Sequence, residues 1–147
     1  MHKLLFLALP LLLAGSVAQA KAKPADLKWG PAPDALPSGA EMAVVSGDPG
    51  KKGMFVVRLK MPADYAVPAH WHPTNETVKV LSGKLHYGMT DKLDLAKAKT
   101  LTVGHAVTMK AKMNHWIHAP GAATVQVSGM GPFQITYVDP KDDPRKK

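Results

Sequence analysis

The stretch His70-Trp71-His72-Pro73-Thr74-Asn75-Glu76, near the middle of the 147-residue chain, gathers several residues that can bind a metal. Residues at i and i+2 of a β-strand point to the same face of a sheet, about 6.6 Å apart along the backbone, so His70 and His72 can share one ion. The bend that Pro73 and Asn75 favour lets Glu76 reach the same point. Glutamate is rare in this chain, with Glu41 as the only other one, and this rarity draws attention to the Glu76 carboxylate. The stretch predicts a site of two imidazoles and one carboxylate.

Short apolar or alternating runs recur on both sides of this stretch, and turns rich in Gly, Pro, Asp and Ser separate them. Only Asp91–Lys99 could form a helical turn. Such regular spacing predicts an all-β protein built as an antiparallel sandwich or barrel. The expected strands are Met42–Val45, Met54–Met61, Thr77–Leu81, Lys84–Met89, Thr100–Val103, Ala106–Met109, Asn114–His118, Thr124–Val127 and Phe133–Val138.

With Gly83, the stretch reads H-x-H-x3-E-x6-G, which resembles the first motif of the cupin superfamily. That family consists of small double-sheet jelly rolls, also called double-stranded β-helix barrels, that hold a metal ion inside the barrel. The family motif begins with a Gly six positions before the first His, where this chain has Asp64. A turn at that position accommodates Asp. The resemblance implies a jelly-roll barrel over about Met54–Val138.

The second cupin motif is matched in part. Gly104 and His115 have the expected spacing, and the resemblance implies that His115 is a fourth metal ligand. The family's Pro, Gly and Asn positions hold Lys110, Lys112 and Ala119, a departure that affects the turn before His115. His70–Glu76, taken with the ending Gly131-Pro132-Phe133 and Tyr137-Val138-Asp139-Pro140, resembles small exported bacterial cupins.

The expected cofactor is one divalent transition metal on His70, His72, Glu76 and His115. Nitrogen and oxygen ligands of this kind accept manganese, iron, nickel, zinc or copper, so the identity of the metal stays open. The resemblance implies oxygenase, isomerase or decarboxylase chemistry on a small molecule at this metal. The alternative is a non-catalytic, metal-dependent module that binds or senses a small molecule.

No catalytic acid or base can be assigned from the sequence. The polar residues that could supply one are Tyr65, Arg58, Tyr87 and Gln126. One of these pointing at the ion would favour an enzyme, whereas a purely apolar barrel lining would favour a binding module. The sequence has no G-x-S-x-G elbow, dinucleotide-binding glycine pattern or H-E-x-x-H helix.

The remaining histidines and the tryptophans near the site have structural interpretations. We expect His86 and His105 to be exposed and His118, three residues after His115, to face away from the ligands. Trp71 and Trp116 alternate with the proposed ligands, which predicts that they pack outside the barrel or at a subunit contact. Most methionines are expected to fill the core.

The chain has a candidate signal peptide over residues 1–20. A positively charged start precedes an apolar stretch, and Ala18-Gln19-Ala20 has small residues at the two positions that a signal peptidase recognises. This pattern predicts cleavage after Ala20 and a periplasmic or secreted protein. No cysteine is present, so disulfides and thiolate metal sites are excluded. We expect an extended Pro- and Ala-rich arm over 21–40, the barrel over 41–140 and a charged tail over 141–147.

A net charge of +8 is spread along the chain without a basic helix, so we expect no nucleic-acid partner and, after signal cleavage, no membrane association. The expected partner is a small-molecule substrate or ligand. The arm could lie across a neighbouring copy, and we expect a homodimer.

Overall fold

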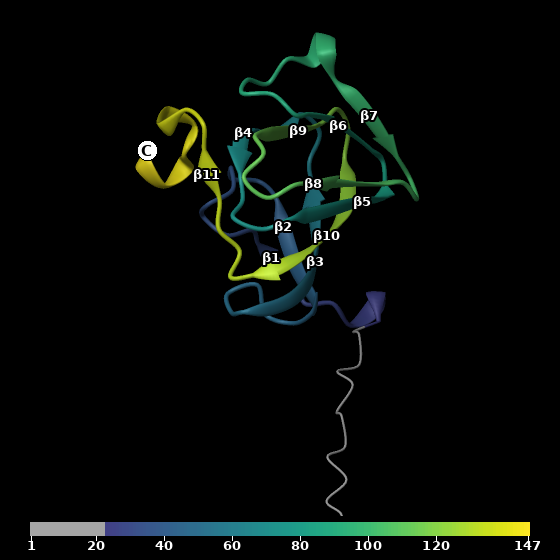
Figure 1. The fold of residues 1–147 in the computed structure, drawn as a ribbon. Coiled ribbons are helices and arrows are strands. Elements are labelled where there is room, and N and C mark those ends of the chain that lie inside the picture. Colours follow the sequence, from purple (N-terminus) through teal and green to yellow (C-terminus); the bar gives the residue numbers. More distant parts are fainter. Residues whose placement is uncertain (1–22) are drawn as a thin grey trace, which may run out of the picture.

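The computed structural model describes residues 23–147, so the predicted signal peptide, residues 1–20, lies outside the described residues (Figure 1). Two antiparallel sheets face each other, which confirms the expected all-β jelly roll. One sheet has the order β1 (Gly30–Pro31), β2 (Glu41–Ser46), β3 (Gly53–Met61), β10 (Ala123–Gly131), β5 (Glu76–Ser82) and β8 (Ala106–Met109). The other has the order β11 (Thr136–Tyr137), β4 (Tyr65–Trp71), β9 (His115–Ala119), β6 (Lys84–Gly88) and β7 (Lys99–Thr102). Within residues 23–147, four short 3₁₀ helices accompany the strands, namely η1 (Pro24–Asp26), η2 (Leu95–Lys97), η3 (Pro140–Asp142) and η4 (Pro144–Lys146).

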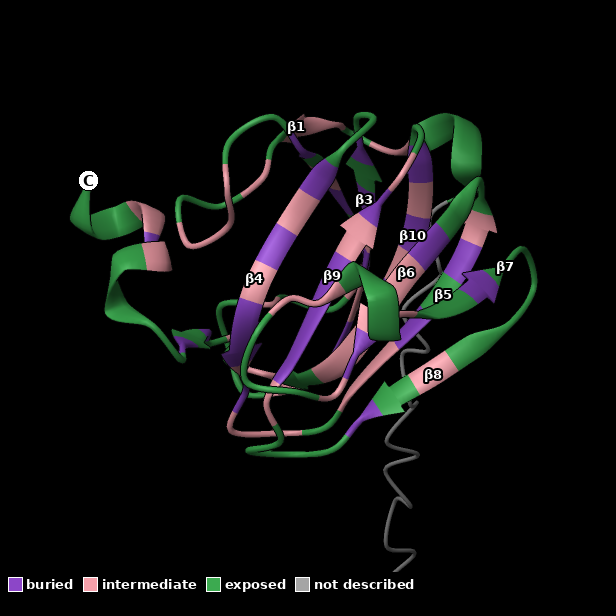
Figure 2. Ribbon diagram, turned by 90° about the horizontal axis from the view of Figure 1, so that it is seen from above, coloured by how far each residue is buried: buried purple, intermediate pink, exposed green. Residues whose placement is uncertain are grey.

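The core lies between the sheets and follows from the period-2 pattern of the strands. In β3, Phe55, Val57, Leu59 and Met61 are buried, while the residues between them are half-buried or exposed. Figure 2 shows the same alternation of buried and more exposed residues along several strands of both sheets. Removal of each such apolar side chain from water contributes about 1.5–3 kcal/mol, and this contribution holds the two sheets together.

Strand β4 was not among the strands predicted from the sequence, and it contains an irregularity that determines the site. Val67 pairs with Ile117 and His70 pairs with His115, so the register with β9 shifts by one residue between the two pairs. Paired residues point to the same face of a sheet, and this bulge therefore turns His70 to the same inner face as Val67. Without the extra residue, simple alternation would place His70 on the outer face.

Two turns place ordinary residues in the left-handed region of backbone space. Within residues 23–147, only Asp64 (φ 61°) and Lys112 (φ 62°) combine a side chain with a positive φ. At both positions the cupin motifs have a Gly that this chain lacks, so the turns form although these glycines are missing. The turn before His115, where the chain departs from the second motif, is thus present, and Lys112 N donates a hydrogen bond to His72 O at 2.8 Å.

The described part of the arm folds over its own barrel. Its start is anchored where the Lys60 ammonium lies 3.9 Å from the Trp29 ring centroid. We call residues 32–40 the strap. The Tyr65 hydroxyl donates to Pro37 O at 2.6 Å and the Tyr137 hydroxyl donates to Ala35 O at 2.7 Å, so strands β4 and β11 hold the strap in place.

The C-terminal end differs from the expected strand. Of the predicted strand Phe133–Val138 only β11 forms, because Phe133 N donates to Pro49 O and this residue turns toward the barrel mouth. The end of the chain lies beside β11 (Figure 1), where the Arg145 guanidinium donates to Asp143 and to Ile135 O. The predicted helical turn within 91–99 is present as η2.

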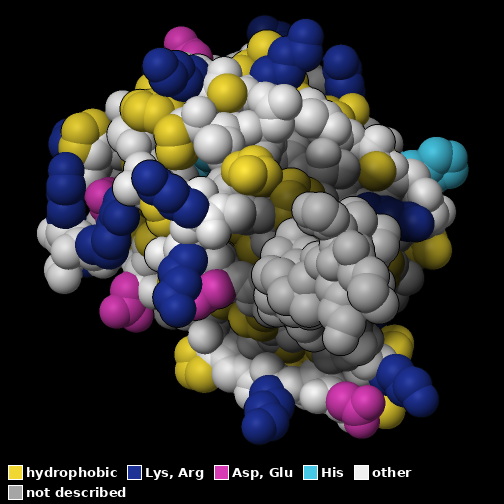
Figure 3. All heavy atoms as spheres, turned by 60° about the horizontal axis from the view of Figure 1, so that its bottom comes forward, with side chains coloured by type: hydrophobic (Ala, Val, Ile, Leu, Met, Phe, Trp, Pro, Cys, Tyr) yellow, Lys and Arg dark blue, Asp and Glu magenta, His cyan; other side chains and the backbone are white. Residues whose placement is uncertain are grey.

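The described surface shows no concentration of charge on the face drawn in Figure 3, where Lys and Arg side chains are scattered among Asp, Glu and apolar side chains. Among residues 23–147, no helix has the length and apolar character needed to span a membrane.

Candidate metal centre

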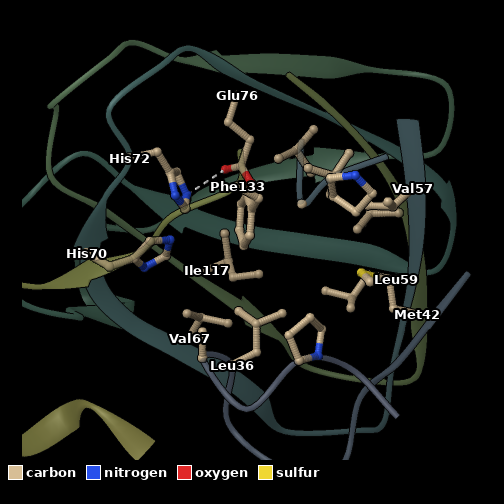
Figure 4. Close-up of a pocket in the computed structure, with 17 residues that line it drawn as sticks. Leu36, Met42, Val57, Leu59, Val67, His70, His72, Glu76, Ile117 and Phe133 are labelled. Carbon is tan, nitrogen blue, oxygen red and sulfur yellow. Dashed lines mark ion pairs between the residues drawn. The ribbon is translucent and has the colours of Figure 1, made fainter. Parts of the chain in front are cut away.

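Four residues from three parts of the chain converge on the inner face of the barrel. His70 lies near the end of β4 and His72 follows this strand, while Glu76 begins β5 and His115 begins β9. All three imidazoles are buried, with residue exposures of 4%, 4% and 1%, and the Glu76 side chain is 13% exposed. Figure 4 shows His70, His72 and Glu76 along one side of a cavity. The structure therefore brings together the residues that the sequence singled out.

Each imidazole is oriented by a backbone carbonyl. Nδ1 of His70 donates to Pro68 O at 2.7 Å, Nδ1 of His72 donates to Gln134 O at 2.7 Å, and Nδ1 of His115 donates to Met113 O at 2.9 Å. A carbonyl oxygen can only accept, so these bonds assign a proton to each Nδ1 and, in the neutral ring, leave the Nε2 lone pair free. Metal-binding histidines are commonly oriented in this way.

The free nitrogens lack suitable hydrogen-bond partners. Nε2 of His72 and Nε2 of His115 are buried without a hydrogen bond, and each lies 3.4 Å from Oε2 of Glu76, which is long for such a bond. One ligand atom from each of His70, His72 and His115 lies within 4.8 Å of the others, close enough for the three residues to hold a metal ion. A cation placed among them would satisfy the buried polar atoms, so the residues present fit a metal.

The charge state of the cluster depends on close contacts between its members. Burial, together with the charges of His115 and His72, lowers the pKa of His70 to about 3. Burial acts to lower the pKa of His72 as well, but the Glu76 carboxylate outweighs it and raises this pKa. Burial acts to raise the pKa of Glu76, but the two imidazoles beside it lower this pKa well below its usual range. The carboxylate is thus kept ionised, which suits a metal ligand.

The cavity beside the cluster has a volume of about 230 Å³. Apart from His70, His72 and Glu76, the side chains that line it are apolar. Phe133 and the strap residue Leu36 close part of its wall, and sequence reasoning had given neither a role in the site. These walls depend on packing between distant segments, for which the sequence carries no local signal.

The polar residues proposed as acids or bases do not line this cavity. Tyr65 holds the strap through its hydroxyl. Arg58 and Gln126 face each other across β3 and β10, on the face opposite the buried residues of these strands. Tyr87 packs against the core. By the criterion set from the sequence, this apolar lining favours a binding module.

Among residues 23–147, the other three histidines and Trp116 are not part of the cluster. His105 is exposed, as expected, whereas His86 is half-buried with its ring 5.7 Å from that of His118. His118 faces outward, and its Nε2 lies 3.6 Å from Oδ1 of Asp64. Trp116 is 1% exposed, and its indole donates to the Thr90 hydroxyl. Trp116 is thus covered by its own chain and cannot form a subunit contact.

Comparison with known proteins identifies similar structures but no sequence relatives. No protein-family model matches the chain, and no curated protein matches it significantly. The polyketide cyclase RemF from Streptomyces resistomycificus has a TM-score of 0.71 at 14% identity, covering 87% of this chain and 91% of that one. A protein from Methylibium petroleiphilum assigned as an acetylacetone dioxygenase has a TM-score of 0.68 at 20% identity, covering 90% of both chains. An RmlC-like cupin from Ralstonia eutropha has a TM-score of 0.62 at 22% identity, covering 82% of this chain and 73% of that one.

Proposed function

The chain has the fold of the cupin superfamily, and on this basis we propose that it is a divalent-metal protein that acts on a small molecule at the metal. The observation that carries the proposal is the set of buried imidazoles whose Nδ1 atoms are fixed by carbonyls while the Nε2 atoms of His72 and His115 lack partners. His70, His72, His115 and Glu76 would hold the ion. Once bound, it would supply a Lewis acid that polarises a substrate oxygen or supports oxygen chemistry.

The residues of the chain have defined tasks in this proposal. The three carbonyl contacts orient the imidazoles before a metal arrives, and the Glu76 carboxylate offsets part of the metal charge. The apolar walls limit the access of water to a bound molecule, which strengthens electrostatic interactions beside the cluster. Among the described residues that line the cavity, the cluster carries the only titratable side chains, so the metal and its ligands would be the reactive groups.

Two versions of the function remain, and different observations support them. Proteins of similar fold include a polyketide cyclase and a protein assigned as an acetylacetone dioxygenase. These two small-molecule enzymes support oxygenase, isomerase or decarboxylase-type chemistry. The lack of a separate acid or base in the cavity supports a metal-dependent module that binds or senses a small molecule. We place the enzyme first, because a metal with open positions can act without a further side chain.

Metal content provides the first test. Untagged protein should carry close to one transition ion per chain by elemental analysis, and His72→Ala should lose it. His105→Ala is the matched control, since His105 is exposed and outside the cluster. If His72→Ala kept the metal content of the unchanged protein, the assignment of the site would be wrong.

Turnover separates the two versions. Protein loaded with iron, manganese or nickel would be offered diols, β-diketones, flavonols, hydroxy acids and sugars, with oxygen uptake and product masses as readouts. An enzyme should lose more turnover than metal in Glu76→Gln, because the amide is nearly isosteric but uncharged. Saturable binding without consumption for every metal would establish the binding module.

We also propose export and dimerisation. Cleavage after Ala20 would be found by sequencing the N-terminus of the mature protein, and an unprocessed N-terminus would contradict export. Light scattering should give the mass of a homodimer, and a monomer at high concentration would contradict it.

A further inference from the structure

We infer that the cavity takes a small molecule with an uncharged apolar body and one oxygen-bearing head directed at the histidine cluster, and rejects molecules with a second ionised group. This inference rests on the proposed function and deepens it by naming a substrate class. It follows from the distribution of polar and apolar walls around the cavity.

The polar groups lie on one side only. Figure 4 shows His70, His72 and Glu76 together, while Met42 and Leu59 lie on the opposite side of the cavity. These two apolar residues are paired across β2 and β3, which form this far wall. A bound molecule with its head at the imidazoles therefore extends its body toward carbon and sulfur atoms.

No cation is placed to neutralise a second negative charge within the described cavity lining. Arg58 lies on β3 but belongs to its outer face. Lys60 contacts the Trp29 ring, and the exposed Lys51 lies 3.7 Å from Asp48. An ionised group at the far wall would lose its water without gaining a partner, which is strongly unfavourable.

The size of the cavity limits the molecule further. A volume of about 230 Å³ lies below the roughly 300–1,000 Å³ of pockets for drug-sized ligands. The strap residues Ala35 and Leu36 close this space from one side, and Tyr137 holds the strap through Ala35 O. The substrate is therefore a compact molecule, such as a single substituted ring or a short carbon chain.

A matched pair of probes tests the inference by calorimetry on zinc-loaded protein, whose metal content is measured first. 4-Methylcatechol and 3,4-dihydroxybenzoate have the same two adjacent hydroxyl groups, which can chelate a metal. Opposite these hydroxyls, the first has a methyl group and the second has a carboxylate. We expect 4-methylcatechol to bind at least 100-fold more tightly, which corresponds to about 2.8 kcal/mol. Equal affinities with metal present would overturn the inference and leave the proposed function intact.

A second variant keeps the test independent of general damage to the fold. Met42→Lys places a cation at the far wall, where its long stem can lie along apolar surface. It should strengthen 3,4-dihydroxybenzoate binding at least tenfold and weaken 4-methylcatechol binding, while Met42→Leu should leave the preference unchanged. If Met42→Lys bound zinc but the preference did not move, the assignment of the far wall would be wrong.

A measurement on metal-free protein separates failure of the proposed function from failure of the inference about the cavity. Absence of metal binding would contradict the proposed function. The binding of toluene, which needs no metal, would then test the apolar cavity alone by ligand-observed NMR. Toluene binding would support the apolar cavity, and its absence would overturn the inference as well.

Discussion

Substitution of Lys112 by Gly should stabilise the protein. Lys112 has a φ of 62°, and the left-handed region costs a residue with a Cβ about 1–2 kcal/mol. Glycine removes this cost but loses more conformational entropy on folding, about 0.5–1 kcal/mol. The difference predicts a net gain of roughly 0.5–1 kcal/mol in the free energy of unfolding. For a domain of this size the gain corresponds to a rise in Tm of about 2–4 °C.

The measurement is thermal unfolding of metal-free protein followed by circular dichroism, so that metal binding does not contribute. Lys110→Gly is the matched control, because Lys110 lies in the same turn and is not among the residues with positive φ. This control should lose about 0.4–1 kcal/mol through the entropy of the unfolded chain. The backbone bond from Lys112 N to His72 O should persist in Lys112→Gly. A fall in Tm of equal size in both variants would refute the argument from backbone strain.

Three further substitutions test the packing and the strap. Gly88→Ala should cost about 1–3 kcal/mol in a denaturant titration, because the added Cβ would lie 2.5 Å from the Trp116 ring; unchanged stability would contradict this contact. Tyr137→Phe should cost about 0.5–1.5 kcal/mol and speed hydrogen exchange in the strap, since the bond to Ala35 O is lost; unchanged exchange would show that the strap is held otherwise. Burial raises the pKa of Tyr65 to about 12, so the folded state favours the protonated phenol. The stability that this group contributes is complete below pH 10 and is lost as the pH rises toward 12. Tyr65→Phe should therefore lose less stability between these pH values than the unchanged protein. An identical dependence of stability on pH in both proteins would contradict the raised pKa.

Most of the fold was accessible from local patterns in the sequence. Runs such as Met54–Met61 alternate with a clear period of two, and the turns between runs have residues with known backbone preferences. Strand β4 was not predicted because Pro68 interrupts its alternating pattern of apolar residues, and a proline within a strand usually indicates an edge or a bulge. The bulge itself depends on pairing with β9, so its effect on His70 could be found only in the assembled sheet.

The candidate site was predictable where chemistry is tied to spacing. His70, His72 and Glu76 are close in the sequence, and His115 followed from the resemblance to the second cupin motif. The carbonyl partners were not predictable, because Gln134 O reaches His72 across 62 residues. The same holds for the far wall and for the strap, where side-chain placement depends on contacts between distant segments.

The hydrogen bond from Tyr137 to Ala35 spans 102 residues and joins the two ends of the described chain at the cavity. The contact forms between segments far apart in the sequence, and closing such a long loop carries an entropic cost. The wall formed by Ala35 and Leu36 is therefore expected to assemble late and to open by local unfolding while the sheets stay intact. Loss of either partner of this bond is therefore expected to loosen this wall of the cavity while the two sheets stay formed.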